Sequence, residues 1–303
     1  MTILDGKLVA AELEEQMGKE ILSLKEKTGK VPGLTVIIVG EDPASQIYVR
    51  NKDRMAASLG VNSHIIRMSE DVGEAAIIAE INRLNNDDDV DAVLVQLPLP
   101  ARYDTWKILD YLDPSKDVDR FHPANIGMIS VNRTKIYPCT PFGILKILER
   151  YNINLSGKHA VVVGRSFIVG KPMAAMLTNL DATVTLCHSK TSNLGEIIRQ
   201  GDVVVAAIGK PGFVTADMVK DGAILIDVGM NYLESEADVM ALCEEDQIKK
   251  FRKRGYGITG DIHKDAFKKS SYYTPVPGGV GLTTVTMLMY NTIQLFKQRR
   301  GIS

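Results

Sequence analysis

Tyr48 and Lys52 are the residues whose types and spacing first suggest chemistry. They lie four residues apart in the stretch QIYVRNKDR, so on a helix they would share one face. A positioned lysine amine can accept a proton and return it, as a general acid/base does. The commoner alternative is that Lys52 lays its aliphatic stem over Tyr48 and keeps its charge in water.

The location of the pair favours the chemical interpretation. The apolar run LTVIIVG (34–40) predicts a buried strand directly before the helix that carries Tyr48 and Lys52. The start of that helix should therefore face the carboxyl edge of a parallel sheet, where α/β proteins bind ligands. Gln96 ends another predicted strand at the same edge and could hold the lysine by a hydrogen bond. The alternative for Gln96 is a plain polar residue at a strand end.

Two further segments could complete a site. In DPSKDVDRFHPANIG (113–127), which we expect to be irregular, Asp117 and Asp119 should point in opposite directions if the chain is extended. One could then face a cleft, although loop aspartates more often cap turns. The stretch TPVPGGVGLTTV (274–285) predicts a rigid loop with exposed backbone N–H groups followed by a helix, and its alternative is a linker.

The elements that must position these residues alternate between strands and helices, which predicts parallel α/β architecture. In the first half we expect a helix from Leu8 that ends before Gly29, strands over 34–40 and 61–68, a strand ending at Gln96, the Lys52 helix ending at Gly60, and a helix over Glu74–Leu84.

The second half predicts another doubly wound domain. Thr140 is expected as an N-cap and Pro141 as the first helical residue. The expected strands are 158–164, 182–187, 202–209 and 223–229, with helices from about Val169 and near Leu194–Gln200. We expect the charged stretch 233–255 to form a surface excursion, and the helix 282–300 to pack back on the first domain.

The turn GRSFIVGKP follows a strand and opens a helix, as a phosphate-binding turn does. Its spacing is not G-x-G-x-x-G, and a plain strand–turn–helix joint is an equal alternative. The next strand ends in His188-Ser189-Lys190 without the acidic residue that binds the ribose of NAD. Ser189 and Arg165 could instead hold a 2′-phosphate, which favours NADP over NAD, although a solvated strand end is the blander alternative.

Composition supports a soluble cytoplasmic protein. The chain has 303 residues, a net charge of −1 and three cysteines without CxxC spacing, which suggests two domains, no polyanionic partner and a reducing compartment. The five histidines lack metal-site spacing, so we expect no metal. The sequence has neither a signal-peptide pattern nor an apolar run of about 20 residues, so we expect no membrane segment.

Taken together, these segments resemble the bifunctional methylenetetrahydrofolate dehydrogenase/cyclohydrolase family. The matching stretches follow one another in order along nearly the whole chain: EDPAS-x-x-YV-x-x-K, VQLPLP, SKDVD, PCTP-x-G, VVGRS-x-x-VGKP, CHS-x-T, GKPG, IDVG-x-N, GDI and TPVPGGVG. The resemblance implies a folate-binding catalytic domain over 1–139 plus 280–303, a Rossmann-like NADP-binding domain over 140–279, and a cleft between them.

The resemblance also implies roles for individual residues. Lys52 would be the catalytic acid/base, with Tyr48 stacking on the folate, Gln96 holding Lys52 and Asp119 binding the pterin. Further folate contacts would come from Pro275, Gly278, Gly279 and Val280. NADP would be held by Gly164, Arg165, Ser166, Ser189 and Met230. The expected partners are tetrahydrofolate one-carbon derivatives and a second copy of the chain, since the family is usually dimeric; no nucleic acid or membrane partner is expected.

Three departures from the family pattern leave alternatives open. Arg120 replaces a usual glycine after KDVD, Leu282-Thr283 replaces Pro-Met, and the 233–255 excursion is longer than is typical. The first two could change the balance of the two activities, so an enzyme retaining only one of them is an alternative. A non-catalytic NADP-binding sensor is another, but it would have no need of the set Tyr48, Lys52, Gln96 and Asp119.

Overall fold

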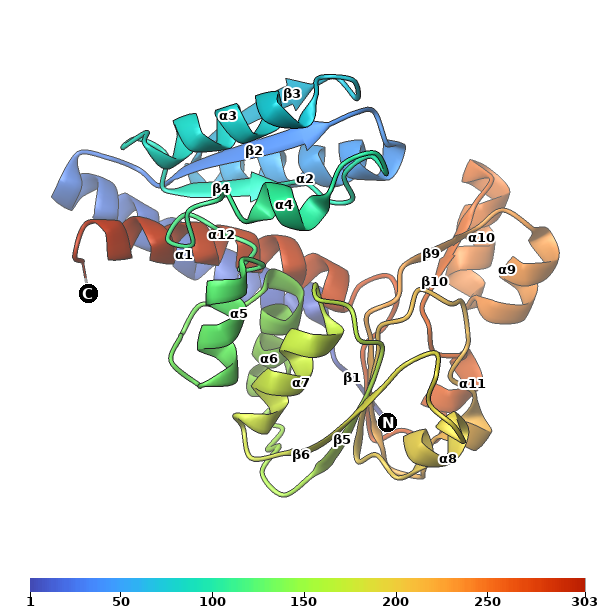
Figure 1. Ribbon diagram of the computed structural model, residues 1–303. Helices are drawn as coiled ribbons and strands as arrows, with labels where there is room; N and C mark the ends of the chain where they lie inside the picture. Colours follow the sequence, from blue (N-terminus) through green and yellow to red (C-terminus); the bar gives the residue numbers. More distant parts are fainter. Residues whose placement is uncertain (303) are drawn as a thin grey trace. The chain divides into compact units, whose positions relative to one another are not determined.

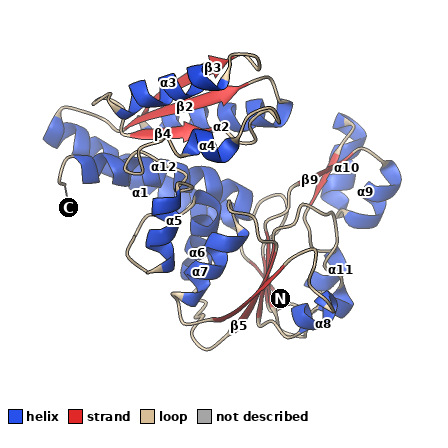
Figure 2. Ribbon diagram, in the orientation of Figure 1, coloured by secondary structure: helices blue, strands red, loops and turns tan. Residues whose placement is uncertain are grey.

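The computed structural model describes residues 1–302, and the chain divides into two compact units. The three-stranded unit comprises Ala11–Cys139 and Val285–Ser303, and the six-stranded unit comprises Met1–Ala10 and Thr140–Thr284. The main sheet of each unit consists of parallel strands alternating with helices; strands are red and helices blue in Figure 2. The α/β fold class expected from the sequence is confirmed.

The sheet of the three-stranded unit has β2 (Gly33–Val39) at its centre. It pairs in parallel with β3 (Asn62–Met68) on one side and β4 (Ala92–Val95) on the other (Figure 1). Every residue of β2 is buried, which explains why the run is apolar at successive positions. The helices between these strands and after them are α2 (Pro43–Leu59), α3 (Glu74–Asn85) and α4 (Thr105–Leu109).

Helix α2, which carries Tyr48 and Lys52, has clear signals at both ends. The Asp42 side chain caps it by accepting a hydrogen bond from the Ser45 N–H at 2.7 Å, and Pro43 follows as the first helical residue. Gly60 ends it in the left-handed conformation with φ 80°. Because β2 ends at Val39, the first turns of α2 lie at the carboxyl edge of the sheet, as predicted.

The segment 113–127 is more regular than expected, because α5 (Pro123–Ser130) begins inside it. The expectation of an irregular segment overlooked the cap, in which the His122 ring accepts a hydrogen bond from Ala124 N and Pro123 occupies the first turn. Before α5, Asp117 forms a parallel bridge with Val93 of β4. The chain just before Asp119 is thereby aligned with the sheet.

The C-terminal helix α12 (Val280–Arg299) packs back on the three-stranded unit from Val285 onward, as predicted. Most of α1 (Gly6–Thr28) belongs to the same unit, and the two helices are joined by a 3.0 Å contact between the Lys297 amine and the Glu20 carboxylate. Gly29 ends α1 with φ 71°, in agreement with its predicted role as a stop signal.

The six-stranded unit contains a fully parallel sheet in the order β1-β11-β8-β7-β5-β6. Its central strands are buried on both faces. The strand bounds are β1 (Thr2–Ile3), β5 (His159–Val163), β6 (Thr183–Cys187), β7 (Val203–Ala206), β8 (Ile224–Asp227) and β11 (Tyr272–Tyr273). The helical elements of this unit are α6 (Cys139–Arg150), α7 (Gly170–Thr178), α8 (Leu194–Arg199), η1 (Ala216–Met218) and α11 (Lys264–Phe267).

The predicted N-cap at Thr140 is wrong, because α6 already begins at Cys139. Thr140 lies inside the first turn, and its hydroxyl accepts a hydrogen bond from the Thr284 hydroxyl at 3.1 Å. Pro141 is still tolerated, because N–H groups in the first turn of a helix have no intrahelical partner. The Thr140 side chain, which the local pattern predicts to cap the helix, instead makes a tertiary hydrogen bond with Thr284.

The charged excursion is a small folded subdomain. Strands β9 (Asn231–Leu233) and β10 (Gly257–Thr259) form an antiparallel pair, and α9 (Glu236–Leu242) and α10 (Glu245–Arg254) lie beside it (Figure 1). Leu233, Val239 and Cys243 form its own buried cluster. Most of α10 is exposed, which accounts for its high charge.

Candidate active site

The Lys52 amine and the Gln96 side chain meet at the carboxyl edge of the three-stranded sheet. Lys52 Nζ donates a hydrogen bond to Gln96 Oε1 at 2.9 Å, and both residues are only 9% exposed. The Gln96 amide is itself oriented, because its Nε2 donates to the Leu97 carbonyl at 2.6 Å. The predicted contact is present, and the amine is held among buried groups instead of extending into water.

The Asp119 carboxyl interacts electrostatically with this lysine. Burial raises the pKa of the Asp119 carboxyl, while the positive charge of Lys52 and a hydrogen bond from Cys139 lower it. The Cys139 Sγ lies 3.4 Å from Asp119 Oδ1. Burial raises the pKa of the Cys139 thiol well above its usual value, so the thiol remains protonated and can donate this hydrogen bond.

The two aspartates of the SKDVD stretch have different roles: one stabilises a turn, and the other faces the predicted site. Asp117 organises its own turn: its carboxylate accepts hydrogen bonds from the N–H groups of Arg120 (3.0 Å) and His122 (2.8 Å), and from Asn125 Nδ2 (2.9 Å). Asp119 instead faces Lys52 and Cys139. Only the second of them is therefore available to a ligand.

Arg120 occupies a conformation that glycine adopts most readily. Its φ is 61°, in the left-handed region that disfavours residues with a side chain. The side chain is 8% exposed, and its Nη1 donates to the Pro114 carbonyl at 3.0 Å. Arg120 thus adopts a backbone conformation typical of glycine, and its side chain is hydrogen-bonded to Pro114 at the start of the same loop.

Tyr48 lies one turn before Lys52 on α2 and is partly buried. The four-residue spacing places both side chains on one helix face. Within the three-stranded unit, Tyr48, Lys52, Gln96 and Asp119 therefore come from α2, the end of β4 and the loop before α5.

Sequence reasoning missed two neighbours of Asp119. The sequence marks Cys139 only as one of three cysteines without CxxC spacing, and it gives no reason to single out Asn291. Asn291 is fully buried on α12, and its Nδ2 donates to the carbonyl oxygens of Val118 and Tyr137, each at 2.9 Å. The PCTP motif offered a signal for Cys139, whereas nothing local to α12 marked Asn291.

The glycine turn of the six-stranded unit brings backbone segments unusually close together. A Cβ on Gly164, which has φ 120°, would lie 2.1 Å from the Ala207 carbonyl oxygen, and a Cβ on Gly170 would lie 1.9 Å from the Gly164 oxygen. Both positions therefore require glycine. The Ser166 hydroxyl caps the start of α7 by accepting hydrogen bonds from Val169 N at 3.2 Å and Gly170 N at 3.4 Å.

A cavity of about 280 Å³ opens beside this turn, at the carboxyl edge of the sheet. It brings together three predicted residues, Gly164, Arg165 and Ser189. Ser166 lies next to it in the turn, and Met230 is not among its lining residues. Sequence reasoning did not assign the remaining lining residues, which are Val163, His188, Leu194, Ala207, Ile208, Lys210 and Phe213.

The predicted loop at 275–280 belongs to the six-stranded unit. Gly278 has φ 115°, and α12 begins at Val280, whose side chain is only 2% exposed. A Cβ on Gly6 would lie 2.1 Å from the Gly279 carbonyl oxygen, so this loop is packed tightly on the start of α1. Thr283, one of the departures from the family pattern, is buried and bonds to the Val280 carbonyl at 2.9 Å.

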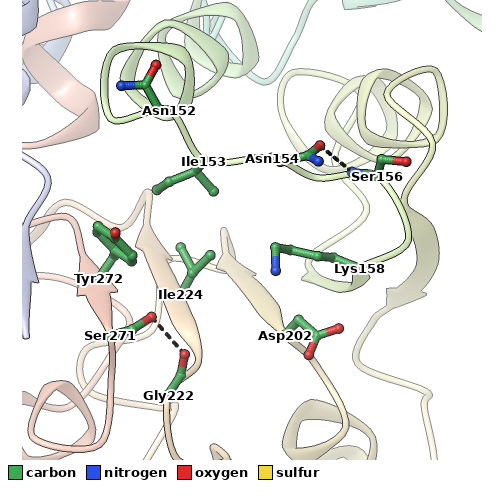
Figure 3. A pocket seen from close by; sticks show the side chains of 10 residues that line it. All are labelled: Asn152, Ile153, Asn154, Ser156, Lys158, Asp202, Gly222, Ile224, Ser271 and Tyr272. Atoms are coloured by element: carbon green, nitrogen blue, oxygen red, sulfur yellow. Dashed lines mark hydrogen bonds between the residues drawn. The ribbon is translucent and has the colours of Figure 1, made fainter.

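A second cavity, of about 360 Å³, lies at the opposite, amino edge of the six-stranded sheet (Figure 3). Its lining includes Lys158, Asp202 and Tyr272, near the starts of β5, β7 and β11. Because phosphate-binding turns follow the carboxyl ends of parallel strands, this cavity does not correspond to the glycine turn. Asp202 is therefore a suitable position for a control substitution in the same sheet.

Within residues 1–302, no group of three or more His, Cys, Asp or Glu side chains could hold a metal ion. In the same part of the chain, no helix is both long and apolar enough to cross a membrane.

Two family models match the chain. The tetrahydrofolate dehydrogenase/cyclohydrolase catalytic domain matches residues 4–119, and the NAD(P)-binding domain of the same family matches residues 138–300. A curated relative, the bifunctional protein FolD of Chlorobium phaeobacteroides (strain BS1), is 49% identical over 309 residues, covering 100% of this chain and 99% of its own.

Solved structures agree over the whole chain. The bifunctional enzyme FolD, a methylenetetrahydrofolate dehydrogenase/cyclohydrolase from Campylobacter jejuni, is 42% identical, with a TM-score of 0.90 and 99% of both chains covered. The Trypanosoma brucei enzyme complexed with NADP cofactor and inhibitor is 36% identical, with a TM-score of 0.89, covering 99% of this chain and 98% of its own. This chain belongs to the tetrahydrofolate dehydrogenase/cyclohydrolase family.

Proposed function

We propose that this protein oxidises 5,10-methylenetetrahydrofolate to 5,10-methenyltetrahydrofolate with NADP, and then hydrolyses the product to 10-formyltetrahydrofolate. The observation that carries the proposal is the buried hydrogen bond from Lys52 Nζ to Gln96 Oε1, with the Asp119 carboxylate close to the amine. The solved Campylobacter jejuni relative is named as a methylenetetrahydrofolate dehydrogenase/cyclohydrolase, and the curated Chlorobium phaeobacteroides relative is named as a bifunctional protein.

The two steps place different demands on the protein. Loss of hydride from a carbon between two nitrogens leaves a cation that both nitrogens stabilise, so this step depends on orientation more than on a base. Ring opening needs proton transfer, because water adds to the cationic carbon and a proton must reach the leaving nitrogen. Lys52 is the side chain placed to take the proton from water and return it to nitrogen.

Gln96 and Asp119 prepare Lys52 for this task. Gln96 holds the amine through a side chain whose own orientation is set by the Leu97 carbonyl. Asp119 supplies a carboxylate that can accept hydrogen bonds from the amino and ring N–H groups of a pterin. Tyr48 would stack on the flat ring system, and Pro275, Gly278, Gly279 and Val280 would provide further folate contacts.

The carboxyl edge of the six-stranded sheet fits a dinucleotide. The close backbone approach at Gly164 and Gly170 is the kind of cradle in which a phosphate can meet backbone N–H groups. When bound, NADP supplies the hydride acceptor. Gly164, Arg165, Ser166, Ser189 and Met230 are the residues proposed to hold it, with Arg165 and Ser189 lining the cavity.

The choice of NADP rests on the residues after β6. The strand ends at Cys187 and continues into His188-Ser189-Lys190, where an NAD enzyme commonly has a carboxylate. A hydroxyl and a nearby guanidinium suit a phosphate, which a carboxylate would repel. The 188–191 turn is ordered by a hydrogen bond from His188 N to the Thr191 hydroxyl at 2.9 Å, which fixes the backbone around Ser189.

The remaining proposals concern assembly, location and domain roles. We propose a homodimer that acts in the cytoplasm, without nucleic acid or membrane partners. Cys139, Cys187 and Cys243 are free thiols, as expected in a reducing compartment. The three-stranded unit would bind folate and the six-stranded unit NADP, with the boundaries of these roles proposed near residues 139 and 280.

The proposal is tested by following NADPH and 10-formyltetrahydrofolate separately after mixing the protein with methylenetetrahydrofolate and NADP. Both should form. Lys52→Met should abolish ring opening while NADP binding is retained. The control is Lys107→Met, because that lysine is exposed and pairs with Glu74 on the protein surface. Near-normal hydrolysis in Lys52→Met would contradict the assigned role of the amine.

The alternatives predict different results. An enzyme with one surviving activity would form NADPH without formyl product, or would hydrolyse methenyltetrahydrofolate without reducing NADP. A sensor would bind NADP and no folate. Arg120 retains a glycine-like turn beside Asp119, and no observation favours either alternative.

A further inference from the structure

Apart from Met230, the residues of three sequence motifs have no role in the proposed chemistry. These motifs are GKPG (209–212), IDVG-x-N (226–231) and GDI (260–262). In the six-stranded unit they meet in one hydrogen-bond network around two buried carboxylates, those of Asp227 and Asp261, which are 1% and 0% exposed.

Asp261 gathers three consecutive backbone N–H groups. Its Oδ2 accepts from Ile208 N at 2.7 Å and from Gly209 N at 2.9 Å, and its Oδ1 accepts from Lys210 N at 2.8 Å. A fourth hydrogen bond comes from Asn231 Nδ2 at 2.9 Å. Successive N–H groups that converge on one anion form a nest, and here the anion is part of the protein.

Asp227 holds Asp261 in turn. Its carboxylate accepts from the backbone N–H groups of Asp261 and Ile262, both at 2.8 Å, and of Gly229 at 3.0 Å. Asp227 is the last residue of β8. Its hydrogen bonds therefore fix the backbone at Asp261 to the end of a sheet strand.

Two glycines of these motifs allow the Asp227 and Asp261 carboxylates to lie close to the backbone that donates to them. A Cβ on Gly260 would lie 1.9 Å from Asp227 Oδ2, and a Cβ on Gly229 would lie 2.3 Å from Asp261 Oδ1. Any side chain at either position would push a carboxylate away from its N–H donors.

The loop held by Asp261 forms a wall of the cavity beside the glycine turn. Ile208 and Lys210 line that cavity together with Gly164 and Ser189. The preceding residue, Ala207, has its carbonyl oxygen where a Cβ of Gly164 would be only 2.1 Å away. A displacement of residues 207–210 would therefore change the shape of the cavity at the glycine turn.

We propose that Asp261 is a positioning residue for the dinucleotide: it fixes residues 208–210 in advance, so that the cavity has its binding shape before NADP arrives. This inference rests on the proposed function, which assigns the cavity to NADP. Preorganisation favours binding because the ordering of the loop does not have to be driven by the ligand.

Asp261→Asn is the direct test, because it keeps the size of the side chain and changes what it can accept. One carboxylate oxygen becomes an NH2 group, which cannot accept from Ile208 and Gly209, or in the other orientation from Lys210 and Asn231. Since a buried N–H without a partner is costly, we expect the loop to loosen and the NADP dissociation constant to rise about tenfold or more.

The measurements are NADP titration by calorimetry, hydrogen exchange of the 208–210 amides, and hydrolysis of methenyltetrahydrofolate. In Asp261→Asn these amides should exchange faster and NADP should bind more weakly. Hydrolysis, which needs no NADP, should stay near the wild-type rate. This combination separates a positioning role from a general loss of structure.

Asp202→Asn is the matched control in the same sheet. Asp202 accepts a hydrogen bond from His159 N at 2.7 Å and pairs with Lys220 at 2.5 Å, but it lies at the amino edge (Figure 3). Its loss should lower stability without changing NADP affinity. If Asp202→Asn weakened NADP binding as much as Asp261→Asn, the inference would be overturned.

Two further outcomes are decisive. If Asp261→Asn binds NADP like the wild type, Asp261 is not a positioning residue, while the proposed function stands; if the wild type itself does not bind NADP, the proposed function fails. Should Asp261→Asn not fold, Asn231→Ala removes only one of the four hydrogen bonds to Asp261. It should weaken NADP binding by a smaller factor with hydrolysis retained, and unchanged binding there would overturn the inference.

Discussion

The Cys139 thiol lies 3.4 Å from the Asp119 carboxylate, at the beginning of α6. Because burial keeps the thiol protonated, the sulfur is a donor to the carboxylate and not a nucleophile. This hydrogen bond and the charge of Lys52 both oppose the rise of the Asp119 pKa on burial. Both neighbours thus favour the ionised form of the carboxylate that would bind the pterin.

Removing the thiol should therefore weaken folate binding. In Cys139→Ala the pKa of Asp119 should rise further, and we expect the folate KM to increase about fivefold, as for loss of one hydrogen bond of about 1 kcal/mol. Cys139→Ser keeps a donor and should change KM less. KM measured against pH for both variants checks this, and equal KM values for Ala, Ser and wild type would contradict it.

Asn291 should help to position Asp119, because it donates a hydrogen bond to the carbonyl of the preceding residue, Val118. Asn291→Ala leaves the buried carbonyls of Val118 and Tyr137 without this donor, which should lower the free energy of unfolding by about 2 kcal/mol. Since Val118 precedes Asp119, the folate KM should rise as well, while NADP affinity should not change.

Thr292→Val is the control for Asn291, because Thr292 is equally buried but its hydroxyl bonds only within α12, to the Leu288 carbonyl at 2.8 Å. Urea unfolding and folate KM are the measurements. A folate KM in Asn291→Ala no higher than in Thr292→Val would show that Asn291 is merely structural.

Arg120 allows the cost of its backbone conformation to be measured. Arg120→Gly and Arg120→Ala both lose the hydrogen bond to Pro114, but only alanine keeps a Cβ at φ 61°. We therefore expect Arg120→Ala to be less stable than Arg120→Gly by about 1 kcal/mol. Thermal unfolding of the two variants side by side checks this, and an alanine variant as stable as the glycine variant would disprove the strain.

Asp227 should make the stability of the six-stranded unit depend on pH. Burial raises the pKa of Asp227 from 3.8 to about 7, although three backbone N–H groups oppose the rise. The folded protein then binds this proton more tightly than the unfolded chain does. The free energy of unfolding should consequently fall as pH rises from about 4 to 7, by an amount on the order of 4 kcal/mol at most.

NMR of the Asp227 carboxyl carbon gives the direct measurement, with an expected midpoint near pH 7. Asp227→Asn should remove the decrease in stability between about pH 4 and 7, whatever constant loss of stability the substitution causes. A carboxyl carbon that titrates near pH 4 would contradict this prediction.

The sequence by itself determined the elements and several of their ends. A short, β-branched apolar run such as LTVIIVG (34–40) is typical of a strand covered on both faces. Gly29 and Gly60 end helices because they adopt positive φ without a side-chain clash. The placement of Lys52 and Gln96 at one sheet edge followed from the same local reasoning, because the carboxyl ends of parallel strands share an edge.

Only the tertiary structure decided how these side chains are held. Asn291 reaches the Val118 carbonyl across 173 positions of sequence, and Asp261 reaches Ile208 across 53. No local periodicity reports such contacts, because they depend on which backbone groups lack partners after the elements have packed. For the same reason, Thr140 hydrogen-bonds to Thr284 instead of capping α6, and Asp119 rather than Asp117 is the aspartate that faces Lys52.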